Sequence, residues 1–205
     1  MLKPHQRGMT LIELMVGLAI LAILLMSGAP SLSEWIRNSQ IRSASESILT
    51  GLHHARAEAV KRNTPVRFQL TSTLENDCAV SASGKNWVVN MSSTTTPAAS
   101  CAAPLDDTAE PFLLQKSVAA NISSRITVTS SQAAVAFNGL GQQTATMNPN
   151  QAPAVMTINI TPTSGACLAD GGTTRCLRIV ISPAGQARMC DPSLTGSTSV
   201  QPMAC

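Results

Sequence analysis

GMTLIELMVGLAILAILLMSGAP, residues 8–30, is the longest apolar stretch in this sequence of 205 residues. From Met9 to Ala29 it runs for 21 residues with a single charge, Glu13. As an α-helix that rises about 1.5 Å per residue, it would measure about 31 Å, the thickness of the hydrocarbon core of a membrane. Basic residues precede the stretch and none lies within it, which favours a cytoplasmic N-terminus. The sequence therefore predicts a transmembrane helix over residues 9–29.

Glu13 distinguishes three interpretations of this segment. A secretory signal peptide cut after Ser27-Gly28-Ala29 would place Pro30 at the new N-terminus and would carry a charge inside its apolar region. A plain anchor helix gives no reason for a carboxylate, which is costly at membrane depth and usually functional. A cut after Gly8 gives Met9 a free amino group, which can neutralise Glu13 four residues further along. Only the third interpretation explains the carboxylate.

The residues around Gly8 resemble the type IV prepilin signature. Gly8 precedes the cut, MTLIEL follows it, and Pro30 becomes the twenty-second residue of the mature chain. The resemblance implies that prepilin peptidase removes a leader of residues 1–8 and that the amino group of Met9 is methylated. It also implies that the apolar helices assemble into a filament core, in which Glu13 aligns incoming subunits and Pro30 belongs to the assembly helix.

The helical pattern continues beyond the apolar segment over residues 30–63. Lys61-Arg62-Asn63 before Pro65 is a typical helix end, with cations in the last turn. His53 and His54 point about 100° apart on a helix, so with Glu58 they form a solvated face rather than a metal site. One stripe of apolar or small residues follows helical spacing: Ile41, Ala44, Ile48, Leu52, Ala55 and Ala59.

Residues 64–205 form a β-rich head. Short runs rich in β-branched residues alternate with turn signals such as Asn138-Gly139, and residues 92–111 look like an exposed loop. The amphipathic helix is expected to cover one antiparallel sheet, which gives an α+β, type IV pilin-like fold. The predicted strands are 66–71, 87–90, 122–130, 133–138, 154–161 and 176–182.

The six cysteines predict disulfides in an oxidising compartment rather than free thiols. Their number is even, and they are spread through sequence rich in Ser, Thr, Pro and Gly. Nearest-neighbour pairing is expected because each bond would close a polar loop, although six cysteines allow 15 pairings. The residues are Cys78, Cys101, Cys167, Cys176, Cys190 and Cys205.

Composition and motifs argue against an enzyme. Aromatic residues make up 2% of the chain, which indicates thin layers rather than a deep pocket. No GxSxG, HExxH, P-loop or GxGxxG pattern is present, so we expect no catalytic residue, cofactor or metal. The net charge is +3, of which Lys3 and Arg7 supply two, so the remaining +1 gives little support for nucleic acid as a partner.

Segments of the head sequence make the resemblance more specific. ARAEAVKRNTPVRF (55–68), AFNGLG (136–141) and LRIVISPAGQARMCDPS (177–193) are similar to the GspH/FimT family of minor pilins and secretion pseudopilins. The resemblance implies a minor pilin that primes the assembly of a type IV pilus or forms its tip, or else a pseudopilin of type II secretion. The implied partners are other minor pilins and the major pilin, prepilin peptidase, the inner-membrane assembly platform and the lipid bilayer. The implied location is the inner membrane with a periplasmic head, and then the filament.

A third role, as a DNA-uptake pilin of natural competence, depends on a C-terminal Gly-Arg-x-Arg motif in similar family members. This chain has Gly185-Gln186-Ala187-Arg188, in which glutamine replaces the first arginine. Arg175, Arg178 and Arg188 could still contact phosphates, but each lost contact weakens binding. With few aromatic residues for base stacking, DNA is a candidate partner that we do not expect to bind strongly.

Overall fold

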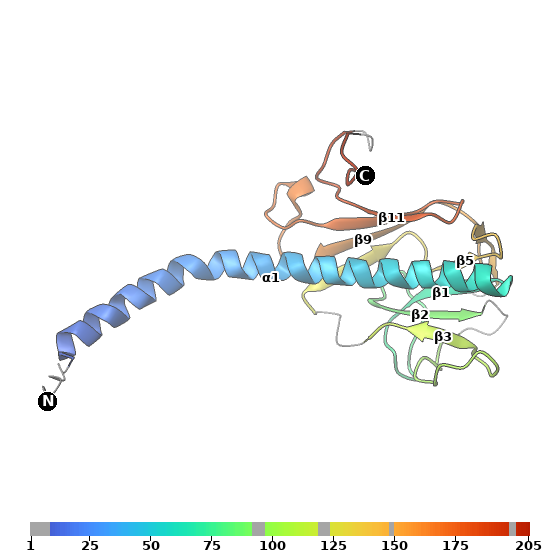
Figure 1. Ribbon diagram of the computed structural model, residues 1–205, viewed down its shortest axis with the longest axis horizontal. Coiled ribbons are helices and arrows are strands. Elements are labelled where there is room, and N and C mark those ends of the chain that lie inside the picture. The colour runs from blue at the N-terminus through green and yellow to red at the C-terminus, as the bar shows by residue number, and fades with distance from the viewer. Residues whose placement is uncertain (1–8, 92–96, 119–123, 148–149, 197–199) are drawn as a thin grey trace, which may run out of the picture. The chain divides into compact units, whose positions relative to one another are not determined.

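A computed structural model shows the chain as a long helix and a β-rich head (Figure 1). It describes residues 9–91, 97–118, 124–147, 150–196 and 200–205, and for residues 26–31 it describes the helical backbone only. The chain divides into two compact units, residues 1–36 and residues 37–205. The leader 1–8 and parts of two predicted segments, 92–96 and 122–123, lie outside the described residues.

Helix α1 spans Leu11–Arg62 and continues through Pro30. It ends where the sequence predicts, because Lys61 and Arg62 lie in its last turn and Asn63 adopts a left-handed backbone with φ of 50°. Within the described residues, no helix has an apolar stretch long enough to cross a membrane.

The head contains two larger antiparallel sheets. The first has the order β3-β2-β1-β5-β6, and the second has the order β11-β10-β9-β4. A small pair, β7 with β8, and a 3-10 turn, η2 (Leu168–Asp170), complete the described elements. The strands are β1 Val66–Thr71, β2 Asn86–Met91, β3 Leu113–Lys116, β4 Ile126–Ser130, β5 Ala134–Phe137, β6 Gln143–Thr144, β7 Thr146–Met147, β8 Asn150–Gln151, β9 Met156–Pro162, β10 Leu177–Ile181 and β11 Ala187–Cys190.

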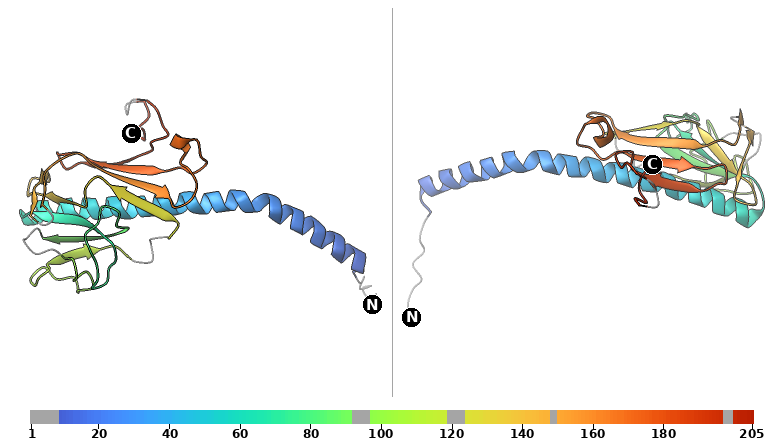
Figure 2. Two further views of the ribbon diagram at one scale, coloured as in Figure 1. Left: turned by 180° about the vertical axis from the view of Figure 1, so that it is seen from behind. Right: turned by 90° about the horizontal axis from the view of Figure 1, so that it is seen from above.

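The predicted apolar stripe of α1 is confirmed, since all six of its residues are buried. The expectation that it covers one sheet is wrong, because the stripe packs in a single core with residues of both sheets. In Figures 1 and 2 the C-terminal half of α1 crosses both sheets, with β9 and β11 beyond one edge of the helix and β2 and β3 beyond the other. The sheet residues of this core alternate along their strands, as in Val66, Phe68 and Leu70 of β1.

The helix and the first sheet approach each other closely at Gly51. A Cβ at this position would lie 2.9 Å from ring carbons of both Phe68 and Trp87. These two rings stack with centroids 5.8 Å apart, and the Trp87 Nε1 donates a hydrogen bond to Ser47 Oγ at 3.1 Å. Gly51 therefore lets the largest aromatic pair of the head pack directly against the helix backbone.

We expect Leu52→Ala to lower the free energy of unfolding of the head by about 2–5 kcal/mol, because it leaves a cavity in the core that joins both sheets. The matched control is Val60→Ala on the exposed side of the same helix, with an expected effect within about 0.5 kcal/mol. Urea unfolding of the full chain in detergent micelles, followed by tryptophan fluorescence, measures both. Equal midpoints for the two variants would contradict the shared core.

Candidate assembly site and the surfaces of the head

The first turn of α1 is closed by a reciprocal pair of side chains. Thr10 donates to Glu13 Oε2 through its backbone N–H at 3.1 Å and through its hydroxyl at 3.0 Å. The Glu13 backbone N–H donates in return to Thr10 Oγ1 at 3.3 Å. This is a capping box, in which two side chains satisfy backbone donors that the helix leaves free. Glu13 was predicted from the sequence and Thr10 was not, although Thr-x-x-Glu before an apolar run is the signal for this motif.

The capping box places the candidate assembly carboxylate at the helix N-terminus, one turn from Met9. Gly8 and the predicted cut lie at the edge of the described residues, so the cleavage stays a prediction. In a mature chain the new ammonium of Met9 and the N–H of Thr10 would compete for the same carboxylate. Because the ammonium carries a full positive charge and the amide does not, Coulomb attraction makes the ammonium the stronger partner of the carboxylate.

The unit of residues 1–36 exposes most of its apolar side chains. Every large apolar residue from Leu11 to Leu25 is exposed, on all sides of the helix. A helix that is apolar all round is normally covered by lipid or by other helices. This surface is therefore the second part of the candidate assembly site.

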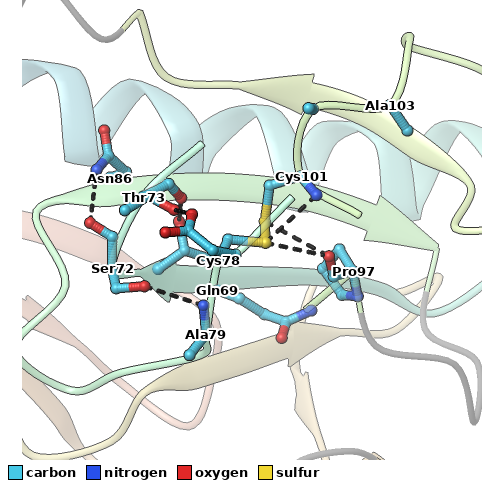
Figure 3. Close-up of a disulfide and its surroundings, with 12 residues drawn as sticks. Gln69, Ser72, Thr73, Cys78, Ala79, Asn86, Pro97, Cys101 and Ala103 are labelled. Atoms are coloured by element: carbon cyan, nitrogen blue, oxygen red, sulfur yellow. Dashed lines mark hydrogen bonds between the residues drawn. A yellow bond between two sulfur atoms is a disulfide. The ribbon is translucent and has the colours of Figure 1, made fainter. Parts of the chain in front are cut away.

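The three disulfides of the head join nearest neighbours in sequence, which is the expected pairing. Cys78–Cys101 ties two loops across β2, where Cys101 N–H donates to Cys78 Sγ at 3.3 Å (Figure 3). Both sulfur atoms lie in a small apolar cluster with Val88 and Leu113. The other bonds are Cys167–Cys176 and Cys190–Cys205.

The exposed-loop prediction for residues 92–111 applies here to residues 97–111, which are held at two further points. The Lys116 ammonium donates to the backbone carbonyls of residues 101, 102 and 103, at 3.1–3.4 Å. Arg62 at the end of α1 donates to Asp107 Oδ2 at 2.7 Å. The loop is thus pinned to both the sheet and the helix, which explains how a segment without strands keeps a fixed path.

A cluster of three buried polar side chains lies on β1 and β2. Gln69 Nε2 and Arg67 Nε both donate to the Asn90 side-chain oxygen, at 2.9 and 3.3 Å. All three side chains are buried, and burial lowers the pKa of Arg67 to about 10. That value keeps the guanidinium protonated at neutral pH, so Arg67 is a structural cation of the sheet.

The three arginines considered for DNA each have a partner within the chain. Arg175 Nε lies 2.8 Å from Asp191 Oδ2, whose side chain is 2% exposed. Arg178 Nε donates to Asn159 Oδ1 at 2.7 Å, and Arg188 donates to the backbone carbonyl of Ala204 at 3.0 Å. A phosphate would have to compete with these acceptors. The pairing of Arg175 with Asp191, 16 residues further along the chain, is a feature of the fold that the sequence pattern did not predict.

His53, His54 and Glu58 are the residues that were considered for metal binding from the sequence. In the part of the chain that the structure describes, no group of three or more His, Cys, Asp or Glu residues could hold a metal ion. Glu58 instead forms ion pairs with Arg62 at 2.6 Å and with Lys61 at 3.3 Å. The hydrogen bond from Arg62, aided by Lys61, lowers the pKa of the Glu58 carboxyl.

Comparisons with known proteins agree with the geometry of both units. The family model described as "Type II transport protein GspH" matches residues 44–185, and the model of the "Prokaryotic N-terminal methylation motif" matches residues 3–29. The chain belongs to the GspH family. The resemblance seen in the sequence is confirmed, and the α+β fold with a long N-terminal helix is the one expected.

Two crystal structures of the type IV minor pilin FimU of Pseudomonas aeruginosa strain PAO1 are similar to this chain at 18% identity. One has a TM-score of 0.48 and covers 78% of this chain and 94% of its own. The other has a TM-score of 0.44 and covers 76% of this chain and 97% of its own. No curated protein matches the sequence.

The two family models match different parts of this GspH-family chain. The methylation motif includes Gly8, Met9 and Glu13, and the GspH match begins within the amphipathic part of α1. The GspH match ends at Gly185, before β11 and the Cys190–Cys205 disulfide. The C-terminal corner that holds Arg188 therefore lies beyond the residues that the GspH model matches.

We expect Thr10→Ala to speed amide hydrogen exchange in the first turn of α1 by about fivefold, because the loss of a helix cap costs about 1 kcal/mol. Thr10→Ser keeps the hydroxyl and is expected to exchange like the wild type. The measurement is hydrogen exchange with mass spectrometry on the full chain in detergent micelles. Identical exchange in all three proteins would mean that the capping box does not hold this turn.

We expect Glu58→Gln to cost about 0.5 kcal/mol of stability at neutral pH, the size of a partly exposed ion pair. Because the folded pKa of Glu58 is lowered, its contribution is present above the ordinary carboxyl pKa and is lost as the pH falls through the lowered value. Urea midpoints of wild type and variant should therefore converge as the pH falls below the ordinary carboxyl pKa and through the lowered pKa of Glu58. Glu46→Gln, in the more exposed pair with Arg42, is the control with a smaller effect. A gap that persists in acid would contradict the ion pair.

Proposed function

We propose that this chain is a minor pilin of a type IV pilus, which acts with other minor pilins to prime filament assembly or to form the tip. The observation that carries the proposal is the methylation-motif match over residues 3–29, joined to a helix whose apolar side chains are exposed. A folded head with its own core adds support, because a pilin displays such a head on a helical stem. The role is structural rather than catalytic.

These residues suggest the order in which the protein would be anchored, processed and assembled. The segment 9–29 anchors the chain in the inner membrane, with the N-terminus in the cytoplasm and the head in the periplasm. Prepilin peptidase cuts between Gly8 and Met9, and the new amino group is methylated. Glu13 then exchanges its contact with Thr10 for an ammonium group, in its own chain or in a neighbour, as the helix enters the apolar filament core. The assembly platform, the major pilin and other minor pilins are the proposed partners.

The second candidate is a pseudopilin of a type II secretion system. The name of the matching family, a type II transport protein, favours it. The same N-terminal processing and anchor serve both machines, so the site residues do not separate them. The discriminating phenotype is found in a deletion strain: loss of exoprotein secretion with normal twitching indicates the pseudopilus, and the reverse indicates the pilus.

We expect mass spectrometry of surface fibres sheared from the native cells to detect this chain at low stoichiometry beside an abundant major pilin. Its N-terminal peptide should begin at an N-methylated Met9, because the leader is removed before assembly. Glu13→Gln is expected to leave the cut unchanged and to reduce the amount of chain in the fibres, because the ammonium loses its anionic partner.

Two outcomes of the fibre experiment would count against the proposal. Fibre-bound chain that retains residues 1–8 beside a working peptidase would contradict the processing step. Mature chain confined to the inner membrane, with none in the fibres, would favour the secretion pseudopilus. Glu46→Gln is the control for a lost carboxylate elsewhere on α1, and it should enter fibres normally.

A further inference from the structure

The chain has two tryptophans, and their surroundings are opposite. Trp87 is 5% exposed, stacks on Phe68 and donates its indole N–H to Ser47. Trp35 on α1 is 67% exposed, and among the described residues its indole has no hydrogen-bond partner. In a chain with 2% aromatic residues, such a side chain left open on a helix calls for an explanation.

The position of Trp35 along α1 suggests what covers it. The exposed apolar residues of the first unit end with Leu32 and Trp35. Over the next turns of α1, as far as Thr50, the exposed side chains are polar or charged, beginning with Ser39 and Arg42. An apolar segment, then an aromatic residue, then a cation is the order found where a transmembrane helix leaves the bilayer, since indole rings gather at the headgroup level.

The spacing agrees with this order. Trp35 lies six residues beyond Ala29, the last residue of the proposed anchor, which is about 9 Å along a helix. The polar headgroup region adds roughly 5–8 Å to each side of the hydrocarbon core. A modest tilt of the helix therefore brings the indole to the level of the lipid headgroups and ester carbonyls, which offer acceptors for its free N–H.

We propose that the Trp35 side chain binds phospholipid headgroups of the periplasmic leaflet. This contact would set the depth of the helix in the bilayer before assembly. This inference rests on the proposed membrane anchor of a pilin subunit and adds to it a specific contact with phospholipid. An aromatic ring at this level resists movement in both directions, because its ring leaves water and its N–H keeps polar partners. Extraction into a filament must break this contact.

The test uses the full chain in phosphatidylethanolamine–phosphatidylglycerol vesicles that carry a nitroxide quencher at the headgroup, near the top of the acyl chain, or near its end. The fluorescence of Trp35 is the difference between the wild type and Trp35→Phe, a safe variant because the side chain is exposed. We expect the headgroup label to quench this difference signal at least about twofold more than the deepest label. Trp87, which alone remains in Trp35→Phe, should be quenched by none of the labels.

A second variant calibrates the depth scale. In Leu25→Trp combined with Trp35→Phe, the added indole lies within the apolar segment, and the deepest label should quench it most strongly. The proposal is overturned if Trp35 in vesicle-bound protein is quenched by aqueous iodide and not by the headgroup label, which would leave a neighbouring pilin as its partner. It is also overturned if the deepest label quenches Trp35 most.

The same samples separate this inference from the proposed function. Protein that floats with the vesicles but fails the quenching test leaves the pilin proposal intact and removes only the role of Trp35. Protein that does not float with vesicles at all overturns the anchor on which both depend.

Discussion

The contact of the Phe68 and Trp87 rings with α1 at Gly51 is the constraint on which the rest of the head depends. The absence of a side chain at position 51 lets both rings lie against the helix backbone. The hydrogen bond from Trp87 to Ser47 fixes the orientation of the indole on that helix. Small residues of the same stripe, Ala44, Ala55 and Ala59, extend the close approach along the helix. Thin layers built from Ala, Val, Ile and Leu can then bury a core without many large rings.

Much of this architecture could be predicted from local patterns. The stripe of α1 and the strands at 66–71 and 176–182 follow helical and alternating periods, which depend only on neighbours in sequence. The division into two sheets could not be predicted in this way. Strands β4 and β5 are consecutive, yet β4 pairs with β9 and β5 pairs with β1, so long-range pairing separates them. Strands β3 and β11 were missed because LLQK and ARMC show no clear alternation or β-branched enrichment.

The candidate site, like the fold, could be predicted from the sequence only where the signal is local. Glu13 could be found from the sequence because a lone charge in an apolar run is conspicuous, and Thr10 could have been found from its spacing. The partners of the C-terminal arginines could not, because they depend on tertiary structure: Arg175 precedes β10, Asp191 follows β11, and the antiparallel pairing of these two strands brings both residues to the same end of the sheet. A basic residue counted as free in the sequence is therefore held in the fold. The charge available to an anionic partner is smaller than the composition indicates.

The distribution of the core explains how such a chain can serve two environments. Among the described residues, every member of the main core lies between Ile41 and Met189, and none of them comes from the unit of residues 1–36. The disulfides close loops with sequence separations of 23, 9 and 15, and they stabilise segments that contribute few strands. The folding energy of the head is thus independent of what covers the exposed apolar helix. In the proposed pilin function, such a subunit would exchange lipid for neighbouring helices around residues 9–36 while its head keeps one structure, so that assembly would require only a change of partner.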